Sequence, residues 1–320
     1  MQSFFESMTP QMTEKRRLRD DANYIGVMML ALEGVMFLLS ILLQVANQLL
    51  SPDGTAFLLI YAAIYSVGMA LPAIVISVAT KRRHFPLSPA RAVSPTDAFF
   101  GILASVGVCM AANIVVNIIV SFFASVGVPE PEMPDYLQPT IPSLLLNLFV
   151  FAVLPALLEE LVFRGYVLRA LRPYGDWLAV VVSSLMFALM HGNIAQIPFA
   201  MIVGIALGWL YVMTDNIWLP VAVHFANNAF SFLLQYYSLG MDETRLGMMN
   251  AFSIFSLIVI GAISLAVLIG RRSVLFRRLP QRSSLSLGER VGTIFGSPAF
   301  ITSVAVFMLL TVLDVIGSME

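Results

Sequence analysis

Three short runs of polar residues interrupt the apolar middle of this 320-residue chain, and their side chains are of the kinds that can hydrolyse an amide bond. The first run contains Glu159 and Glu160, the second ends at His191, and the third begins at His224 and includes Asn228. A charged side chain at the centre of a membrane helix costs roughly 2.5–3.5 kcal/mol on insertion scales. Such residues inside apolar segments therefore mark a candidate functional site.

The two adjacent glutamates are expected to differ, because only one of them has a cation one helical turn away. Glu160 and Arg164 are four residues apart on one face, in the favourable acidic-to-basic order. Glu159 points about 100° away around the helix and has no such partner in its own turn. We therefore predict that Glu160 and Arg164 form a structural ion pair and that Glu159 has a functional role.

The helical rise allows Glu159 and His191 to meet inside the membrane. Each lies about 18–21 Å from the cytoplasmic end of its predicted helix. His224 is predicted to lie only about 10 Å from the cytoplasmic boundary. Its helix would have to be tilted or recessed to bring it to the depth of Glu159 and His191. Glu159 and His191 together could orient and deprotonate a water molecule.

His224 and Asn228 are one turn apart on the same face of a predicted helix. An imidazole N–H and an amide NH₂ can therefore converge on one point and stabilise the oxyanion that forms when water attacks an amide carbonyl. Together with Glu159 and His191, this pair predicts peptide hydrolysis without a covalent intermediate.

These residues also carry a family resemblance. Three motifs, in this order on successive membrane segments, resemble the CPBP family of CaaX-processing and bacteriocin-processing proteases, also called ABI or Rce1-like proteins: Glu159-Glu160-x-x-x-Arg164, Phe187-x-x-x-His191 and His224-x-x-x-Asn228. Phe163 and Gly165 flank the arginine as they often do in the family. The resemblance covers roughly Ser143 to Tyr237.

The resemblance implies an eight-helix membrane core with a catalytic cavity open to the cytoplasm. It implies that Glu159 and His191 activate the water, and that His224 and Asn228 form the oxyanion hole. Glu160 and Arg164 would brace their helix. Some members cut prenylated C-terminal peptides and others are linked to bacteriocin immunity, maturation or scaffolding. We therefore expect a membrane-associated or membrane-tethered peptide or protein as the substrate.

A zinc metalloprotease is the nearest alternative, with Glu159, His191 and His224 as ligands and water in the fourth position. The chain has no His-Glu-x-x-His run, and Asn228 is a poor zinc ligand. We therefore expect a glutamate-type protease without a cofactor.

A non-catalytic protein is a second alternative: a membrane scaffold, a bacteriocin-immunity protein or a transporter. In a transporter, Glu33, Glu159 and His191 would form a proton path. Glu33 could equally be a lone acid that faces the bundle interior, and Asn113 and Asn117 could be ordinary helix-pairing contacts.

Composition indicates what must position these residues. Hydrophobic residues make up 59% of the chain and charged residues 12%, and apolar stretches long enough to cross a bilayer recur along it. This predicts an all-α, polytopic transmembrane bundle of about eight or nine helices. The predicted helices are Tyr24–Leu50, Ala56–Ala79, Phe99–Gly127, Ser143–Leu171, Trp177–Met190, Ala195–Met213, Ile217–Tyr237, Phe252–Ile269 and Pro298–Ile316.

The chain divides into a polar tail (1–23), N-terminal transmembrane helices (24–142), catalytic core helices (143–238) and C-terminal transmembrane helices (239–320). The loops Thr80–Asp97, Val128–Pro142 and Gly270–Ser297 are predicted to be solvated connectors. The net charge is −1, but Lys and Arg are concentrated in loops on one side of the alternating helices. The positive-inside rule then predicts a multi-pass protein of the cell membrane with a cytoplasmic N-terminus and an external C-terminus. This topology accounts for the basic clusters, so a nucleic-acid function has no support.

Overall fold

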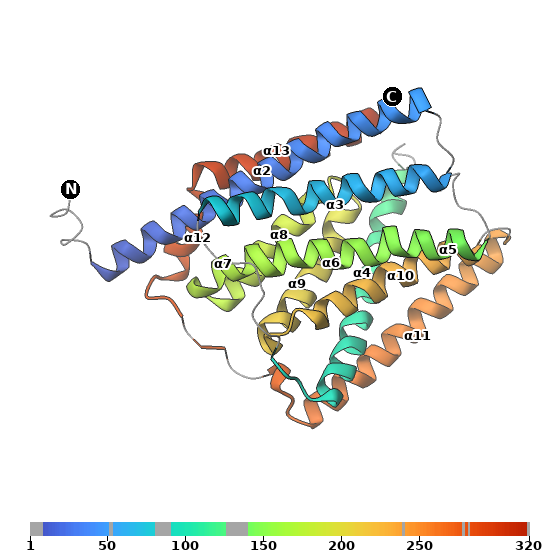
Figure 1. Cartoon of the computed structure of the whole chain (residues 1–320). Coiled ribbons are helices and arrows are strands. Elements are labelled where there is room, and N and C mark those ends of the chain that lie inside the picture. The colour runs from blue at the N-terminus through green and yellow to red at the C-terminus, as the bar shows by residue number, and fades with distance from the viewer. Residues whose placement is uncertain are drawn as a thin grey trace.

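The computed structural model describes residues 9–50, 54–80, 91–125, 140–238, 241–276, 279–280 and 282–318. These residues form helices joined by short connections and contain no strand, which confirms the predicted all-α class (Figure 1). The main helices are α2 (Pro10–Leu50), α3 (Gly54–Ala79), α4 (Pro95–Ser125), α8 (Asp176–Met190), α9 (Gln196–Thr214), α10 (Trp218–Ser238), α11 (Glu243–Gly270) and α13 (Pro298–Ser318).

An interrupted helix between α4 and α8 carries the two glutamates. Its pieces are α5 (Ile141–Leu148), η1 (Phe149–Val153), α6 (Leu154–Glu160), η2 (Leu161–Leu168), α7 (Arg169–Leu171) and η3 (Arg172–Tyr174). The segments η1 and η2 are π-helical, and they flank α6. Wide turns of this kind are frequent at functional sites. Hydropathy predicts only a continuous helix here, so the widening is a property that the structure reveals.

Seven of the described helical segments are long and apolar enough to cross a membrane, which confirms a multi-pass membrane protein. The helix α8 is apolar but shorter than these seven. The helix α10 is not among them because His224, Asn227 and Asn228 lower its hydropathy. Both helices nevertheless pass through the bundle in Figure 1, so all nine predicted helices have a counterpart.

The first helix starts earlier than predicted. It begins at Pro10 rather than at Tyr24, and Leu18 and Ala22 are fully buried in the main hydrophobic core. The polar and charged residues of this segment therefore belong to a helix that is partly packed against the bundle.

The segment Gly270–Ser297 is predicted from the sequence to be a solvated connector throughout. The structure corrects this prediction, because the segment contains the helix α12 (Leu287–Phe295). A capping box between Ser286 and Glu289 starts this helix, and the hydrogen bonds from Ser286 lower the pKa of the Glu289 carboxyl. Its inner face buries Thr293 and Ile294. Its nine residues are too few and too polar to stand out in a hydropathy profile. Most of the other two predicted connectors lies outside the described residues.

The start of α2 and the end of α13 lie at opposite ends of the bundle (Figure 1). The helices α2 and α13 run side by side, and the Asn23 side chain accepts a hydrogen bond from the Ala299 N–H at 3.1 Å. The start of α2, the connection from α7 to α8 and the connection from α9 to α10 share one end, which we call the basic end. The start of α4 and the stretch from the end of α11 through α12 belong to the same end. Of the described Lys and Arg residues, only Arg164 and Arg245 lie outside these segments and the stretch from α7 to α8.

Candidate active site

A buried carboxylate, Glu160, is the centre of the polar cluster. Its Oε1 accepts a hydrogen bond from Arg164 Nη1 at 2.8 Å and one from His224 Nδ1, also at 2.8 Å. Glu160 and Arg164 are fully buried and His224 is nearly so. The predicted ion pair between Glu160 and Arg164 is therefore present, and it is joined by a histidine from a distant helix.

A close approach of α8 and α9 completes the environment of Arg164. Its Nη2 donates to the Gly204 carbonyl at 3.0 Å. A Cβ at Gly204 would lie 2.9 Å from the Cβ of Ser184, so a larger residue there would push α9 away from α8. The guanidinium also lies over the Phe187 ring, 4.7 Å from its centroid, in a cation–π contact.

The neighbouring Glu159 is also buried, and it faces a tyrosine from α3. The Tyr65 hydroxyl donates to Glu159 Oε1, and Tyr61 stacks on Tyr65 at a centroid distance of 6.1 Å. The other oxygen, Oε2, lies 3.7 Å from His224 Nε2 and has no hydrogen-bond partner among the described residues. Glu159 therefore keeps one carboxylate oxygen available beside a histidine nitrogen.

Sequence analysis did not identify Tyr65. A tyrosine inside an apolar helix is usually a packing residue with a polar tip, and nothing in the spacing of α3 links it to Glu159. The only local signal is the second tyrosine, Tyr61, one turn earlier on the same face.

His191 and Phe187 pack against each other at the end of α8. His191 is the C-cap residue directly after α8. Its Nδ1 donates a hydrogen bond to the Phe187 carbonyl oxygen at 2.8 Å. The centroid of its ring lies 4.9 Å from the centroid of the Phe187 ring. The Phe187 centroid in turn lies 5.8 Å from the centroid of the His224 ring. Phe187 thus packs against both histidines. The hydrogen bond to the backbone leaves Nε2 of His191 as the nitrogen that can accept a proton.

His224 and Asn228 have separate hydrogen-bond partners in this structure. His224 Nδ1 is bonded to Glu160, whereas Asn228 Nδ2 donates to the Phe151 carbonyl in η1 at 3.4 Å. Asn227 in turn donates to Asn228 Oδ1 at 3.2 Å. The bond to Phe151 is long and therefore weak, so Asn228 could exchange it for a stronger acceptor.

The three residues of the zinc alternative do not form a ligand set. Among the described residues, no three or more His, Cys, Asp or Glu side chains gather closely enough to hold a metal ion. Glu159 and His224 are neighbours, but the contacts that fix His191 are with Phe187. The side chains thus do not fit the zinc site that the alternative requires.

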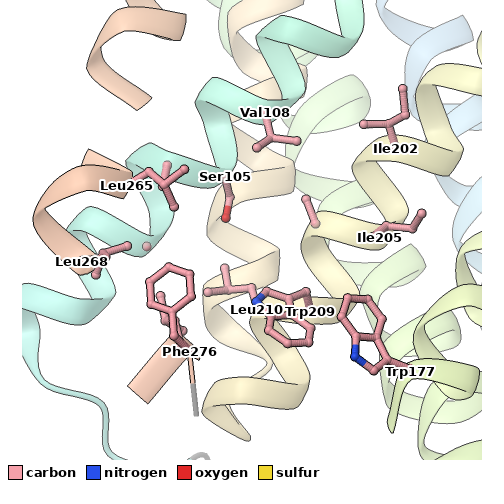
Figure 2. A pocket seen from close by; sticks show the side chains of 14 residues that line it. Ser105, Val108, Trp177, Ile202, Ile205, Trp209, Leu210, Leu265, Leu268 and Phe276 are labelled. Carbon is pink, nitrogen blue, oxygen red and sulfur yellow. The ribbon is translucent and has the colours of Figure 1, made fainter. Parts of the chain in front are cut away.

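An apolar cavity of about 360 Å³ lies between α4, α9 and α11 (Figure 2). Ile205 and Trp209 face it, and Trp209 stacks on Trp177 at a centroid distance of 4.5 Å. Its walls carry almost no polar groups, so it offers no chemistry for hydrolysis.

The segment that carries the cluster matches a known family. Residues 141–230 match the profile of the family described as type II CAAX prenyl endopeptidase Rce1-like. This match confirms the resemblance inferred from the three motifs: the central part of this multi-pass membrane protein is similar to the Rce1-like family.

Two curated relatives are each similar to a part of the chain. One relative is a Bacillus subtilis protein named as the membrane peptidase YdiL, which is 26% identical over 107 residues. These residues are 33% of this chain and 44% of the relative. The other, the membrane-embedded CAAX protease MroQ of Staphylococcus aureus, is 32% identical over 95 residues, which are 28% and 38% of the two chains. The chain thus matches less than half the length of either relative. No solved structure matches it.

Proposed function

We propose that this protein is an intramembrane endopeptidase that hydrolyses a peptide bond with a water activated by Glu159. The observation that carries the proposal is the position of Glu159 Oε2. This atom is buried, has no direct hydrogen-bond partner in the described part of the chain and lies 3.7 Å from His224 Nε2. A polar separation of this length is too long for a direct hydrogen bond and suits a bridging water. The match to a prenyl endopeptidase family supports the same activity.

In this mechanism Glu159 accepts a proton from the water while the water oxygen attacks the carbonyl carbon of the substrate. Tyr65 holds Glu159 Oε1, so that Oε2 is directed to the water. The proton then passes to the leaving amine, and a carboxylate and an amine are released. His191, whose Nε2 is left as an acceptor, is the second candidate to orient the water or relay this proton.

His224 and Asn228 are the candidates for stabilising the oxyanion. A doubly protonated His224 donates from Nδ1 to Glu160 and has a second donor, Nε2–H, on the side of Glu159. Asn228 would exchange its contact with Phe151 for the oxyanion.

We propose a membrane-tethered peptide or protein as the substrate. The family description supports a prenylated C-terminal peptide, because it names a prenyl endopeptidase of the CAAX type. The basic end would face the cytoplasm, since loops rich in Lys and Arg stay on that side of a membrane.

The proposal is tested by incubating purified protein in proteoliposomes with a library of lipid-tethered peptides, including prenylated C-terminal ones. We expect wild-type protein to release peptide fragments, identified by mass, and Glu159→Gln to release none. The variant keeps the volume of the side chain and an oxygen that can accept from Tyr65, so it should remain folded. Full activity of Glu159→Gln would exclude Glu159 as the base.

A further inference from the structure

A second cavity, of about 390 Å³, opens between α4, α10 and α11, and about half of its lining residues are polar although it lies among membrane helices. Five uncharged polar residues from the three helices line it: Asn113, Asn117, Ser231, Gln235 and Asn250. Four of the five side chains are amides, which both donate and accept hydrogen bonds. Such a cavity matches a neutral, hydrogen-bonding ligand rather than a lipid chain.

The buried polar atoms of this cavity need a partner. Asn250 Oδ1 is buried and has no hydrogen-bond partner among the described residues. Asn113 satisfies part of its own capacity by donating to the Cys109 carbonyl at 3.1 Å. A buried amide oxygen without a partner destabilises the fold, because it loses the hydrogen bonds that it makes in water. Water supplies such partners in cavities that are both polar and roomy, and this one has space for several molecules.

A line of polar groups on α10 connects this cavity to the candidate active site. Ser231, in the cavity wall, donates to the Asn227 backbone carbonyl at 3.1 Å. The Asn227 side chain donates to Asn228 Oδ1 at 3.2 Å and is almost completely buried. Asn227 Oδ1, like Asn250 Oδ1, is buried and has no hydrogen-bond partner in the described part of the chain. Polar atoms therefore continue from the cavity to a residue of the proposed oxyanion hole.

We propose that the amide-lined cavity is a hydrated inlet, which supplies the water consumed in hydrolysis through Asn227. Its residues lie toward the end of α4, the end of α10 and the start of α11, all at the end of the bundle opposite to the basic end (Figure 1). Water thus enters from the side away from the basic loops. The inlet rests on the proposed function, because a transporter or scaffold would consume no water.

Thiol labelling tests whether the cavity is hydrated, without any measurement of activity. Cys109 is the only cysteine in the sequence and is fully buried, so Cys109→Ala gives a cysteine-free background. Asn250→Cys and Gln235→Cys place a thiol in the cavity. Ile114→Cys, on the exposed face of α4 between the two cavity asparagines, is the matched lipid-facing control.

The probe is a membrane-impermeant trimethylammonium methanethiosulfonate, added to sealed vesicles from either side. Because only the thiolate reacts, and it forms in water rather than in lipid, we expect the cavity cysteines to be modified at least about tenfold faster than Ile114→Cys. The faster reaction should come from the side away from the basic end. Equal, slow modification of all three cysteines would overturn the inlet.

Turnover tests whether this water is used. We expect Asn250→Leu to lower kcat several-fold with unchanged KM and undiminished thermal stability. Asn250→Gln, which keeps a side-chain amide, should retain most of the wild-type kcat. Wild-type turnover in Asn250→Leu would overturn the supply role. The two proposals can fail separately. Fast labelling of a protein that cleaves no peptide would contradict the protease alone, and slow labelling of an active protease would contradict the inlet alone.

Discussion

The imidazole of His224 is hydrogen-bonded to Glu160, a residue 64 positions earlier in the chain, at the same carboxylate oxygen that accepts from Arg164. One glutamate thus connects the cation of its own helix with the histidine of α10. This places His224 Nε2 beside the second glutamate, Glu159. The ion pair is therefore part of the device that positions the candidate active site.

We expect Arg164→Met to lower stability strongly, because Glu160 then loses the cation that compensates its charge. Breaking one half of a buried ion pair costs about 3–5 kcal/mol. Thermal unfolding in detergent should show a large decrease in Tm for Arg164→Met. The double variant Glu160→Gln/Arg164→Met should lose less than the sum of the two single variants. Strict additivity would mean that the two side chains do not interact.

Tyr65→Phe should reduce turnover while leaving the fold intact, because it removes only the hydroxyl that holds Glu159 Oε1. A hydrogen bond to a charged group contributes about 1.5–3 kcal/mol. If this bond serves only to orient the base, its loss corresponds to a decrease in kcat of roughly 10- to 150-fold. Steady-state kinetics should show this decrease with little change in KM. Tyr61→Phe is the matched control, since Tyr61 stacks on Tyr65, and it should be nearly as active as wild type.

Asn228→Ala should slow the chemical step if Asn228 contacts the oxyanion. Removing one such donor typically costs about 10²–10³ in turnover. Affinity for the substrate should change little, because the contact forms only in the transition state. Single-turnover kinetics can separate the two effects. A large increase in KM with unchanged kcat would instead assign Asn228 to ground-state substrate binding.

The dependence on metal ions distinguishes the glutamate mechanism from the zinc alternative. We expect active protein to contain no stoichiometric metal on elemental analysis and to keep its activity after dialysis against a strong chelator. One zinc per active chain, lost together with activity in His224→Ala, would establish a metalloprotease, because a ligand change empties a metal site.

The orientation can be tested by fusing a reporter at single positions. A reporter after Arg83 or Arg278 should read cytoplasmic, and one after Asp135 or Glu320 should read external. The reason is the concentration of Lys and Arg at one end of the alternating helices. A cytoplasmic reading after Glu320 would show that one of the nine helices does not cross the membrane.

The sequence by itself determined the features that depend on neighbouring residues. Apolar runs predicted the nine helices, and the spacing of Glu160 and Arg164 predicted their ion pair, because residues four apart always share a helical face. The polar residues were also recognisable from the sequence, since each is conspicuous in an apolar segment.

Only the tertiary structure decided which of these polar residues meet. Tyr65 is 94 residues from Glu159, and the contact depends on how α3 packs against α6. The estimated depth of His224 gave a mismatch that the packing of α10 against Glu160 removes. The π-helical segments and the partners of Asn228 and His191 were likewise not predictable. Helical periodicity fixes directions within one helix, whereas the rotation, tilt and depth of each helix relative to its neighbours are set by side-chain packing across the whole bundle.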